Sequence, residues 1–208
     1  MVKVILTSDD FGLSSVYNEK IIEQIENNKL TSVSILVNYV TNFQQMQIQR
    51  LQELMNSHAL SLGLHLEISS SEISKVLNDQ WNLFFDIFNF FPNYVDIHKA
   101  SAYKCNFDAV AFFCIQKMIP FRQYPDTNIQ VKSPDVSITA TRKSFNELKE
   151  VLETINSNKT YEFIFHIGIY DPVSKSSFNK ERELDIDKLN FVVNNLNDKA
   201  KLISYNDI

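Results

Sequence analysis

The stretch VKVILTSDDFGLS, residues 2–14, joins a short apolar run to two adjacent aspartates and a glycine. The run VKVIL is rich in branched aliphatic residues and has the length of a buried strand. Adjacent carboxylates repel each other, and Gly12 gives the backbone a freedom that other residues lack. Paired acids at the end of a strand therefore predict a polar site at the carboxyl edge of a sheet.

Short strand-like runs of this kind alternate with longer helix-like segments along the whole chain, which is typical of a mostly parallel sheet wrapped by helices. The strand-like runs are residues 2–6, 33–38, 60–66, 94–98, 119–123, 136–140, 161–169 and 201–205. The helix-like segments are residues 14–29, with Ser14 or Ser15 as N-cap, and residues 42–58, 76–91, 106–118, 144–157 and 185–198. The fold class predicted is α/β, an irregular, TIM-barrel-like (β/α) barrel with mostly parallel strands.

The composition limits the classes of protein that the chain can represent. The 208 residues are 44% hydrophobic and 22% charged, which predicts a single compact domain over residues 1–208. The net charge of -5 and the lack of a Lys/Arg-rich run argue against a nucleic-acid partner. No apolar stretch approaches about 18 residues, so we expect no membrane partner and a cytoplasmic location. Cys105 and Cys114 lack metal or disulfide spacing and are predicted to be core thiols.

Three of the four histidines lie at the ends of predicted strands, as the aspartate pair does. His65 lies late in the run LSLGLHL, His98 ends YVDIH and His166 lies late in YEFIFHIGI, whereas His58 lies at a helix end. One histidine near a strand end is more often structural than a ligand, and an aspartate pair can simply cap a helix. Because the carboxyl ends of parallel strands converge on one face, we expect these side chains to share a rim.

One aspartate and two histidines supply the mixed oxygen and nitrogen ligands of a divalent cation with open positions, where bound water becomes acidic. In this interpretation Asp10 holds the ion and Asp9 is the general base, and the remaining histidine protonates the leaving group. The ion would also offset the repulsion between the two carboxylates. The sequence contains no G-x-S-x-G elbow, P-loop or dinucleotide fingerprint, so it gives no support to a serine hydrolase, an NTPase or a Rossmann enzyme.

The ordered segments TSDDFGLS, VSILVN, LGLHLEIS, PNYVDIHK, FIFHIG, ERELD and KLISYNDI resemble the YdjC-like carbohydrate deacetylases, the family that includes diacetylchitobiose deacetylase. The resemblance runs from residue 4 to residue 208. It implies a metal-dependent hydrolase that removes the acetyl group of an N-acetylated amino sugar or short chitooligosaccharide and releases acetate. It assigns Asp10, His65 and His98 to the metal, Asp9 to the base, and His166 to the acid or transition-state stabiliser.

Two departures from the family pattern stand out: Lys99 and Ala100 follow His98 where relatives carry further histidines, and Ile167 replaces the proline of H-P-G. Arg122 resembles a substrate-binding arginine near the family site, and a structural ion pair is an equal alternative. The resemblance implies Mg²⁺, since family members are often described with magnesium, whereas two soft imidazole ligands favour Zn²⁺. The expected partner is a small carbohydrate, with a homodimer possible. Alternatives are a non-catalytic carbohydrate-binding relative, a metal hydrolase for another small substrate, and a barrel isomerase or aldolase.

Overall fold

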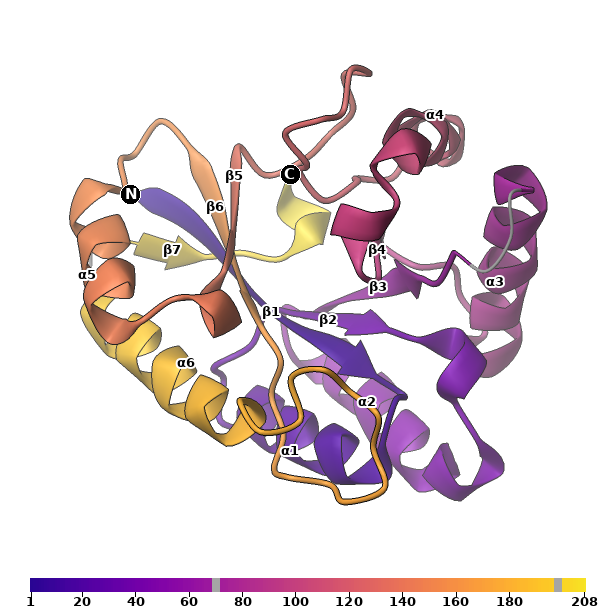
Figure 1. Ribbon diagram of the computed structural model, residues 1–208, viewed down its shortest axis with the longest axis horizontal. Helices are drawn as coiled ribbons and strands as arrows, with labels where there is room; N and C mark the ends of the chain where they lie inside the picture. Colours follow the sequence, from indigo (N-terminus) through magenta and orange to yellow (C-terminus); the bar gives the residue numbers. More distant parts are fainter. Residues whose placement is uncertain (69–71, 197–199) are drawn as a thin grey trace.

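The structure is a computed structural model that describes residues 1–68, 72–196 and 200–208. Its centre is one curled sheet of parallel strands in the order β4-β3-β2-β1-β6-β5, with β7 paired to the first residues of β1 (Figure 1). Because β4 and β5 lie at the two ends of this order, the sheet is an open half-barrel. The strands are β1 Val2–Phe11, β2 Ser32–Ile35, β3 Ser61–Leu66, β4 Tyr94–Ile97, β5 Val136–Thr139, β6 Thr160–Phe165 and β7 Ala200–Leu202.

The helices pack around the outer side of the curled sheet (Figure 1). They are α1 Ser15–Glu26, α2 Gln45–Ser57, α3 Ile73–Phe88, α4 Phe107–Lys117, α5 Phe145–Thr154 and α6 Arg182–Leu196. In the described part of the chain, none of the helices combines the length and the apolar character that a membrane crossing requires. The predicted α/β barrel-like class is therefore confirmed, in the form of a half-barrel.

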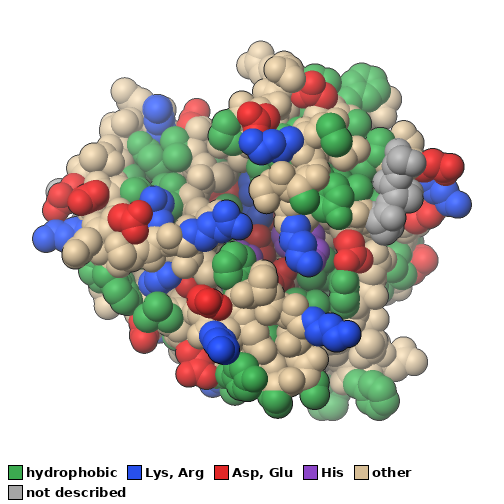
Figure 2. All heavy atoms as spheres, viewed as in Figure 1, with side chains coloured by type: hydrophobic (Ala, Val, Ile, Leu, Met, Phe, Trp, Pro, Cys, Tyr) green, Lys and Arg blue, Asp and Glu red, His purple; other side chains and the backbone are tan. Residues whose placement is uncertain are grey.

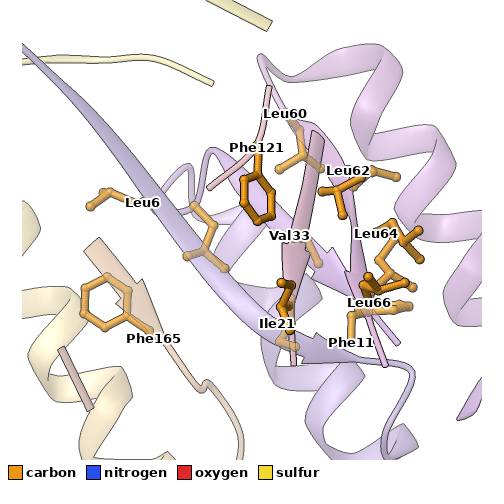
Figure 3. Close-up of a cluster of buried hydrophobic side chains, with 14 of the residues drawn as sticks. Leu6, Phe11, Ile21, Val33, Leu60, Leu62, Leu64, Leu66, Phe121 and Phe165 are labelled. Carbon is orange, nitrogen blue, oxygen red and sulfur yellow. The ribbon is translucent and has the colours of Figure 1, made fainter. Parts of the chain in front are cut away.

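The two faces of the sheet have opposite character because side chains alternate along each strand. Outward residues such as Leu6, Val33, Leu64 and Phe165 form the hydrophobic core with the helices (Figure 3). The inward residues are largely polar: the Thr7 hydroxyl, for example, donates to a carboxylate of β6 at 2.8 Å. The fold thus places its apolar core outside the half-barrel and its polar groups inside.

The inner face closes at the amino ends of the strands with a small aromatic cluster. The Tyr94 and Tyr205 rings stack at 3.7 Å, and Ile5 and Ile203 complete the cluster. Gly63 faces the Tyr94 ring so closely that an added Cβ would lie 2.3 Å from it. This layer separates the polar interior from the bottom of the half-barrel, so the interior opens at the carboxyl ends of the strands.

The structure corrects several of the predicted elements. The run 119–123 is not a strand, because Phe121 makes only an isolated bridge to Val95. The strand predicted at 161–169 ends at Phe165, so the next residue belongs to the following loop. The helix predicted at 185–198 begins earlier, at Arg182, and its residues 197–198 lie outside the described residues.

Two smaller predictions have different outcomes. Ser14 is the N-cap of α1, as predicted, and its hydroxyl accepts from the Val16 N–H at 3.1 Å. Cys114 is buried as predicted, whereas Cys105 is exposed in a short 3-10 turn before α4 and is not a core thiol.

Candidate metal and proton-transfer site

The end of β1 is distorted so that Asp9 and Asp10 both reach the interior. Successive side chains of a regular strand point to opposite faces. Here the pairing register with β2 shifts between Ser8 and Phe11, and Asp10 has a φ of 70°. A bulge of this type re-aims a side chain. Gly12 follows with a φ of 98°, and an added Cβ there would lie 2.9 Å from a backbone oxygen of residue 36.

A cavity of about 580 Å³ opens at the carboxyl ends of the strands. Figure 2 shows the acidic and histidine side chains in this hollow, with Lys and Arg side chains around it. All six residues predicted from the sequence to act at the site line the cavity, namely Asp9, Asp10, His65, His98, Arg122 and His166. The expectation that the two aspartates and the three histidines share a rim is confirmed, while the chemical roles of all six residues remain predictions.

Asp10, His65 and His98 form a group with the composition and spacing of a metal site. One ligand atom of each lies within 4.8 Å of the others. Asp10 Oδ1 is buried and makes no hydrogen bond among the described residues, and it lies 3.4 Å from His65 Nε2. Two ligands about 2.1 Å from a tetrahedral ion are separated by about 3.4 Å, so the residues fit a transition-metal ion. These three residues are therefore candidate ligands.

His65 is oriented by a carboxylate that the sequence analysis did not single out. Its Nδ1 lies 2.8 Å from Asp96 Oδ1, which leaves Nε2 facing Asp10. Metal-binding histidines usually carry such a carboxylate on the other ring nitrogen. Burial alone lowers the pKa of His65, but the charges of Asp96 and Asp9 outweigh it and raise the pKa to about 10. Without a metal ion, His65 is therefore an imidazolium.

His98, unlike His65, is uncharged at neutral pH. Burial lowers its pKa to about 4, with a further contribution from the positive charge of His65. The two rings are 5.1 Å apart and tilted by 50°. At neutral pH, His98 is uncharged and can bind a cation without first losing a proton.

Arg122 is surrounded by three buried carboxylates. Its Nη1 and Nη2 each lie 2.8 Å from one oxygen of Asp9, and its Nε lies 3.2 Å from both oxygens of Glu162. Nη1 also contacts Asp96. These contacts describe the ion-pair alternative for Arg122 and fix the orientation of Asp9. The substrate-binding role stays a prediction, because the side chain also lines the cavity.

Asp9, His65 and Asp96 form a second group with possible ligand atoms. The Arg122 guanidinium already contacts both of its carboxylates. A cation there would meet a fixed positive charge at contact distance, so the group containing Asp10 and His98 is the better candidate.

His166 lies across the cavity in a separate hydrogen-bonded chain. Its Nδ1 lies 2.8 Å from Thr141 Oγ1, and that hydroxyl also contacts Asp185 Oδ2. The backbone N–H of His166 donates to the same Asp185 oxygen at 2.8 Å. Burial lowers the pKa of His166, against the opposing charges of Asp10 and Asp9. The ring is therefore held at one nitrogen and presents its other nitrogen to the cavity.

Arg182 connects Asp10 to the loop between β6 and α6. Its Nη2 lies 2.5 Å from Asp10 Oδ2 and 2.8 Å from Ser176 Oγ, and its guanidinium lies 3.7 Å from the Tyr17 ring centre. Burial raises the pKa of Asp10, but His65, His166 and Arg182 outweigh that effect and hold it well below its ordinary value. Since Arg182 occupies Oδ2, the oxygen that Asp10 offers to a metal ion is Oδ1, which makes no hydrogen bond among the described residues.

Sequence reasoning missed Asp96, Glu162, Thr141 and the roles of the ERELD segment. A signal existed for the two acids, since each is a charged residue inside an apolar strand-like run, YVDIH or YEFIF. A buried strand that carries a charge needs a partner in the interior. Thr141 follows a weakly apolar run and gave no such signal.

The fold and the site together define a class: parallel half-barrel proteins with a carboxylate and histidine cluster at the carboxyl ends of the strands. Residues 3–75 match the family model described as YdjC-like protein, which confirms the predicted resemblance over that part of the chain. No curated protein matches the sequence significantly.

Solved structures share the fold at low sequence identity. A proposed cellobiose-phosphate cleavage protein from Enterococcus faecalis V583 is 16% identical with a TM-score of 0.77, and the match covers 99% of this chain and 98% of that one. A family 4 acetyl xylan esterase from Clostridium thermocellum, in complex with a cobalt ion, is 12% identical with a TM-score of 0.60 (99% and 89% covered). The chitin deacetylase of Colletotrichum lindemuthianum is 11% identical with a TM-score of 0.61 (96% and 84% covered).

Proposed function

We propose that the protein is a metal-dependent carbohydrate deacetylase that hydrolyses the N-acetyl group of an amino sugar or short chitooligosaccharide and releases acetate. The observation that carries the proposal is the buried Oδ1 of Asp10, which makes no hydrogen bond among the described residues, lies 3.4 Å from His65 Nε2 and is grouped with His98. The YdjC-like match and the half-barrel fold shared with a chitin deacetylase and an acetyl xylan esterase support it.

Asp10, His65 and His98 would hold one divalent ion. When bound, the ion supplies a Lewis acid that polarises the amide carbonyl and raises the acidity of water. Two imidazoles and one carboxylate favour Zn²⁺ or another transition ion over Mg²⁺. The Asp96 carboxylate fixes the ring of His65 with Nε2 toward the site.

The chain's own groups would move the protons of the reaction. Asp9, held in a bidentate pair by Arg122, accepts a proton from the attacking water. The water oxygen bonds to the acetyl carbon, and His166 takes up the second proton of that water at its cavity-facing ring nitrogen. The carbon–nitrogen bond then breaks, and His166 delivers this proton to the departing amine. The products are acetate, the free amino sugar and the proton on Asp9, which passes to solvent, so atoms and charge balance.

The cavity rim suggests an anionic substituent on the sugar. Lys99, Arg142 and Lys175 line the cavity, and Figure 2 shows Lys and Arg side chains around the hollow. The E. faecalis neighbour is described as a proposed cellobiose-phosphate cleavage protein, and cellobiose phosphate is a phosphorylated disaccharide. We infer that a phosphorylated acetylated disaccharide binds more tightly than the neutral sugar, since ammonium and guanidinium groups attract phosphate.

The test is acetate release from N,N′-diacetylchitobiose and its phosphorylated form by protein stripped of metal and reloaded with one ion at a time. We expect wild-type protein to release acetate, and Asp10→Ala and His65→Ala to release none above background. His58→Ala is the matched control, because this histidine caps α2 outside the site. It should retain full activity.

The outcomes separate the candidate functions. Sugar binding without acetate release would favour a non-catalytic carbohydrate-binding relative. Equal activity in wild type, Asp10→Ala and His65→Ala would contradict the proposed site. Lys175→Ala should raise KM for the phosphorylated substrate only, and an equal change for both substrates would contradict the anionic substituent.

A further inference from the structure

The first half of α6 presents three buried charged residues at intervals of three, Arg182, Asp185 and Lys188. Charged residues are seldom fully buried unless they are paired. Arg182 reaches Asp10, whereas Asp185 reaches the His166 side of the cavity. Asp185 and Lys188 do not line the cavity, so their burial calls for a different explanation from substrate contact.

Hydrogen positions between Asp185 and His166 follow from counting donors. Asp185 lies 3.5 Å from the Lys188 ammonium, and as a carboxylate it has no proton to donate. The Thr141 hydroxyl has a single proton, and its contact with Asp185 Oδ2 must use it. Thr141 Oγ1 can then only accept at His166 Nδ1, 2.8 Å away, so Nδ1 carries the ring proton.

Lys188 also fixes the backbone that carries the hydroxyl. Its Nζ donates to the carbonyl oxygens of Ala140 and Thr141 at 3.1 and 2.9 Å. Thr141 is 7% exposed, so solvent does not compete appreciably for its hydroxyl. The hydrogen-bonded chain from Asp185 through Thr141 to His166 is therefore fixed by the contacts of Lys188 and by the bond from the His166 N–H to Asp185.

We propose that Thr141 is a positioning residue that links Asp185 to His166 and holds the neutral imidazole in the Nδ1–H tautomer, with the Nε2 lone pair toward the cavity. This inference rests on the proposed function for its catalytic meaning, but not for its structural content. In the proposed reaction Nε2 is the atom that takes up and delivers the proton. The ring in the other tautomer would present an N–H there and could not accept one.

The direct test is the tautomer of His166, read from ¹⁵N NMR of metal-free protein at a pH where the ring is neutral. Wild type should show Nδ1–H only, and Thr141→Ser, which keeps the hydroxyl, should match it. Thr141→Val removes the hydroxyl at nearly constant volume and should give a mixture of tautomers. If Thr141→Val does not fold, Thr141→Ala serves the same purpose.

Thr7→Val is the matched control, because Thr7 is also buried and its hydroxyl also donates to a carboxylate, Glu162 Oε1, at 2.8 Å. It should leave the His166 signals unchanged. In the acetate assay Thr141→Val should lower kcat by about 100- to 1000-fold, within the range of general acid–base contributions, with little change in KM. Thr141→Ser should restore most of the rate.

Three results would overturn the inference, and the first two are an Nε2–H tautomer in the wild type and unchanged His166 signals in Thr141→Val. A wild-type protein that releases no acetate would instead contradict the proposed function and leave the NMR result to decide the tautomer. A kcat loss in Thr141→Val that Thr141→Ser does not restore would also overturn the positioning role, since the hydroxyl would then not be the group required.

Discussion

Replacing Arg122 with methionine should be strongly destabilising, because one buried guanidinium serves three buried carboxylates. It forms two bonds of 2.8 Å to Asp9, lies 3.1 Å from Glu162 Oε1 and contacts Asp96. Removing one partner of a buried ion pair costs about 3–5 kcal/mol, because the other charge is left unpaired. We expect Arg122→Met near the upper end of this range, a large fraction of the roughly 5–15 kcal/mol that stabilises a typical domain.

The assay is urea unfolding of metal-free protein, followed by fluorescence of Trp81, the single tryptophan. Arg50→Met is the matched control: Arg50 also pairs with two carboxylates, Glu19 at 2.9 Å and Glu26 at 2.6 Å, but its side chain is 41% exposed. Exposed ion pairs contribute about 0–1 kcal/mol to stability, so the free energy of unfolding of Arg50→Met should be close to that of the wild type. Adding Glu162→Gln to Arg122→Met should recover part of the loss.

The destabilisation should also depend on pH. Burial raises the pKa of Asp96, but Arg122 and His65 outweigh it and lower the pKa below its ordinary value. The wild type therefore gains stability from Asp96 above the unfolded-state pKa of about 3.9 and loses it only as the pH falls through the folded-state value. Without Arg122 the folded-state pKa rises, so the difference between wild type and variant should shrink from pH 8 to pH 5. An Arg122→Met loss no larger than that of Arg50→Met would refute the reasoning.

Two further predictions concern the metal ligand His65 and the closed end of the half-barrel. Because the pKa of His65 is about 10, metal-free protein holds a proton there that the unfolded chain releases near pH 6.5; this stabilisation is full below pH 6.5 and is lost as the pH rises toward 10. Binding of Zn²⁺ at pH 7.5 should therefore release about one proton from the wild-type protein and less than that from Asp96→Asn. Calorimetry in buffers of different ionisation enthalpy measures this release. If the wild type releases no proton, His65 is not a ligand. Gly63→Ala would place a Cβ 2.3 Å from the buried Tyr94 ring and should lower the free energy of unfolding in urea by about 1–3 kcal/mol or more. Adding Tyr94→Leu should recover part of this loss. An unchanged unfolding midpoint in Gly63→Ala would contradict the prediction.

The sequence alone predicted the strands that carry the site because their signals are local. Apolar runs bounded by polar residues define β3 and β4 to within one residue, and the convergence of parallel strands brings Asp10, His65 and His98 together. The run 2–6 gives the start of β1, but the strand continues to Phe11 and contains the aspartate pair that was predicted to follow it. The prediction of a strand at 119–123 was wrong for the same reason, because an apolar run does not show whether a neighbouring strand has an edge free to pair with it.

The supporting groups could not be predicted because their partners are distant in the chain. Arg122 reads equally as a substrate ligand or an ion-pair partner until Asp9 and Glu162, separated from it by 113 and 40 residues, are placed around it. The β1 bulge is another such feature, since nothing in TSDDFGLS states that Asp10 adopts a positive φ. Local patterns specify elements, whereas the site's protonation states follow from tertiary contacts.

The charge of the interior links these protonation states to metal binding. Asp9, Asp10, Asp96 and Glu162 bring four negative charges, whereas the two guanidinium groups that contact them, Arg122 and Arg182, bring two positive ones. With a proton on His65, one negative charge remains unbalanced in a low-dielectric interior. A divalent ion with both imidazoles neutral would bring the cluster to zero charge. The proton on His65 and the metal ion are therefore alternative counterions for the same carboxylates, and the pH sets which of them the interior holds.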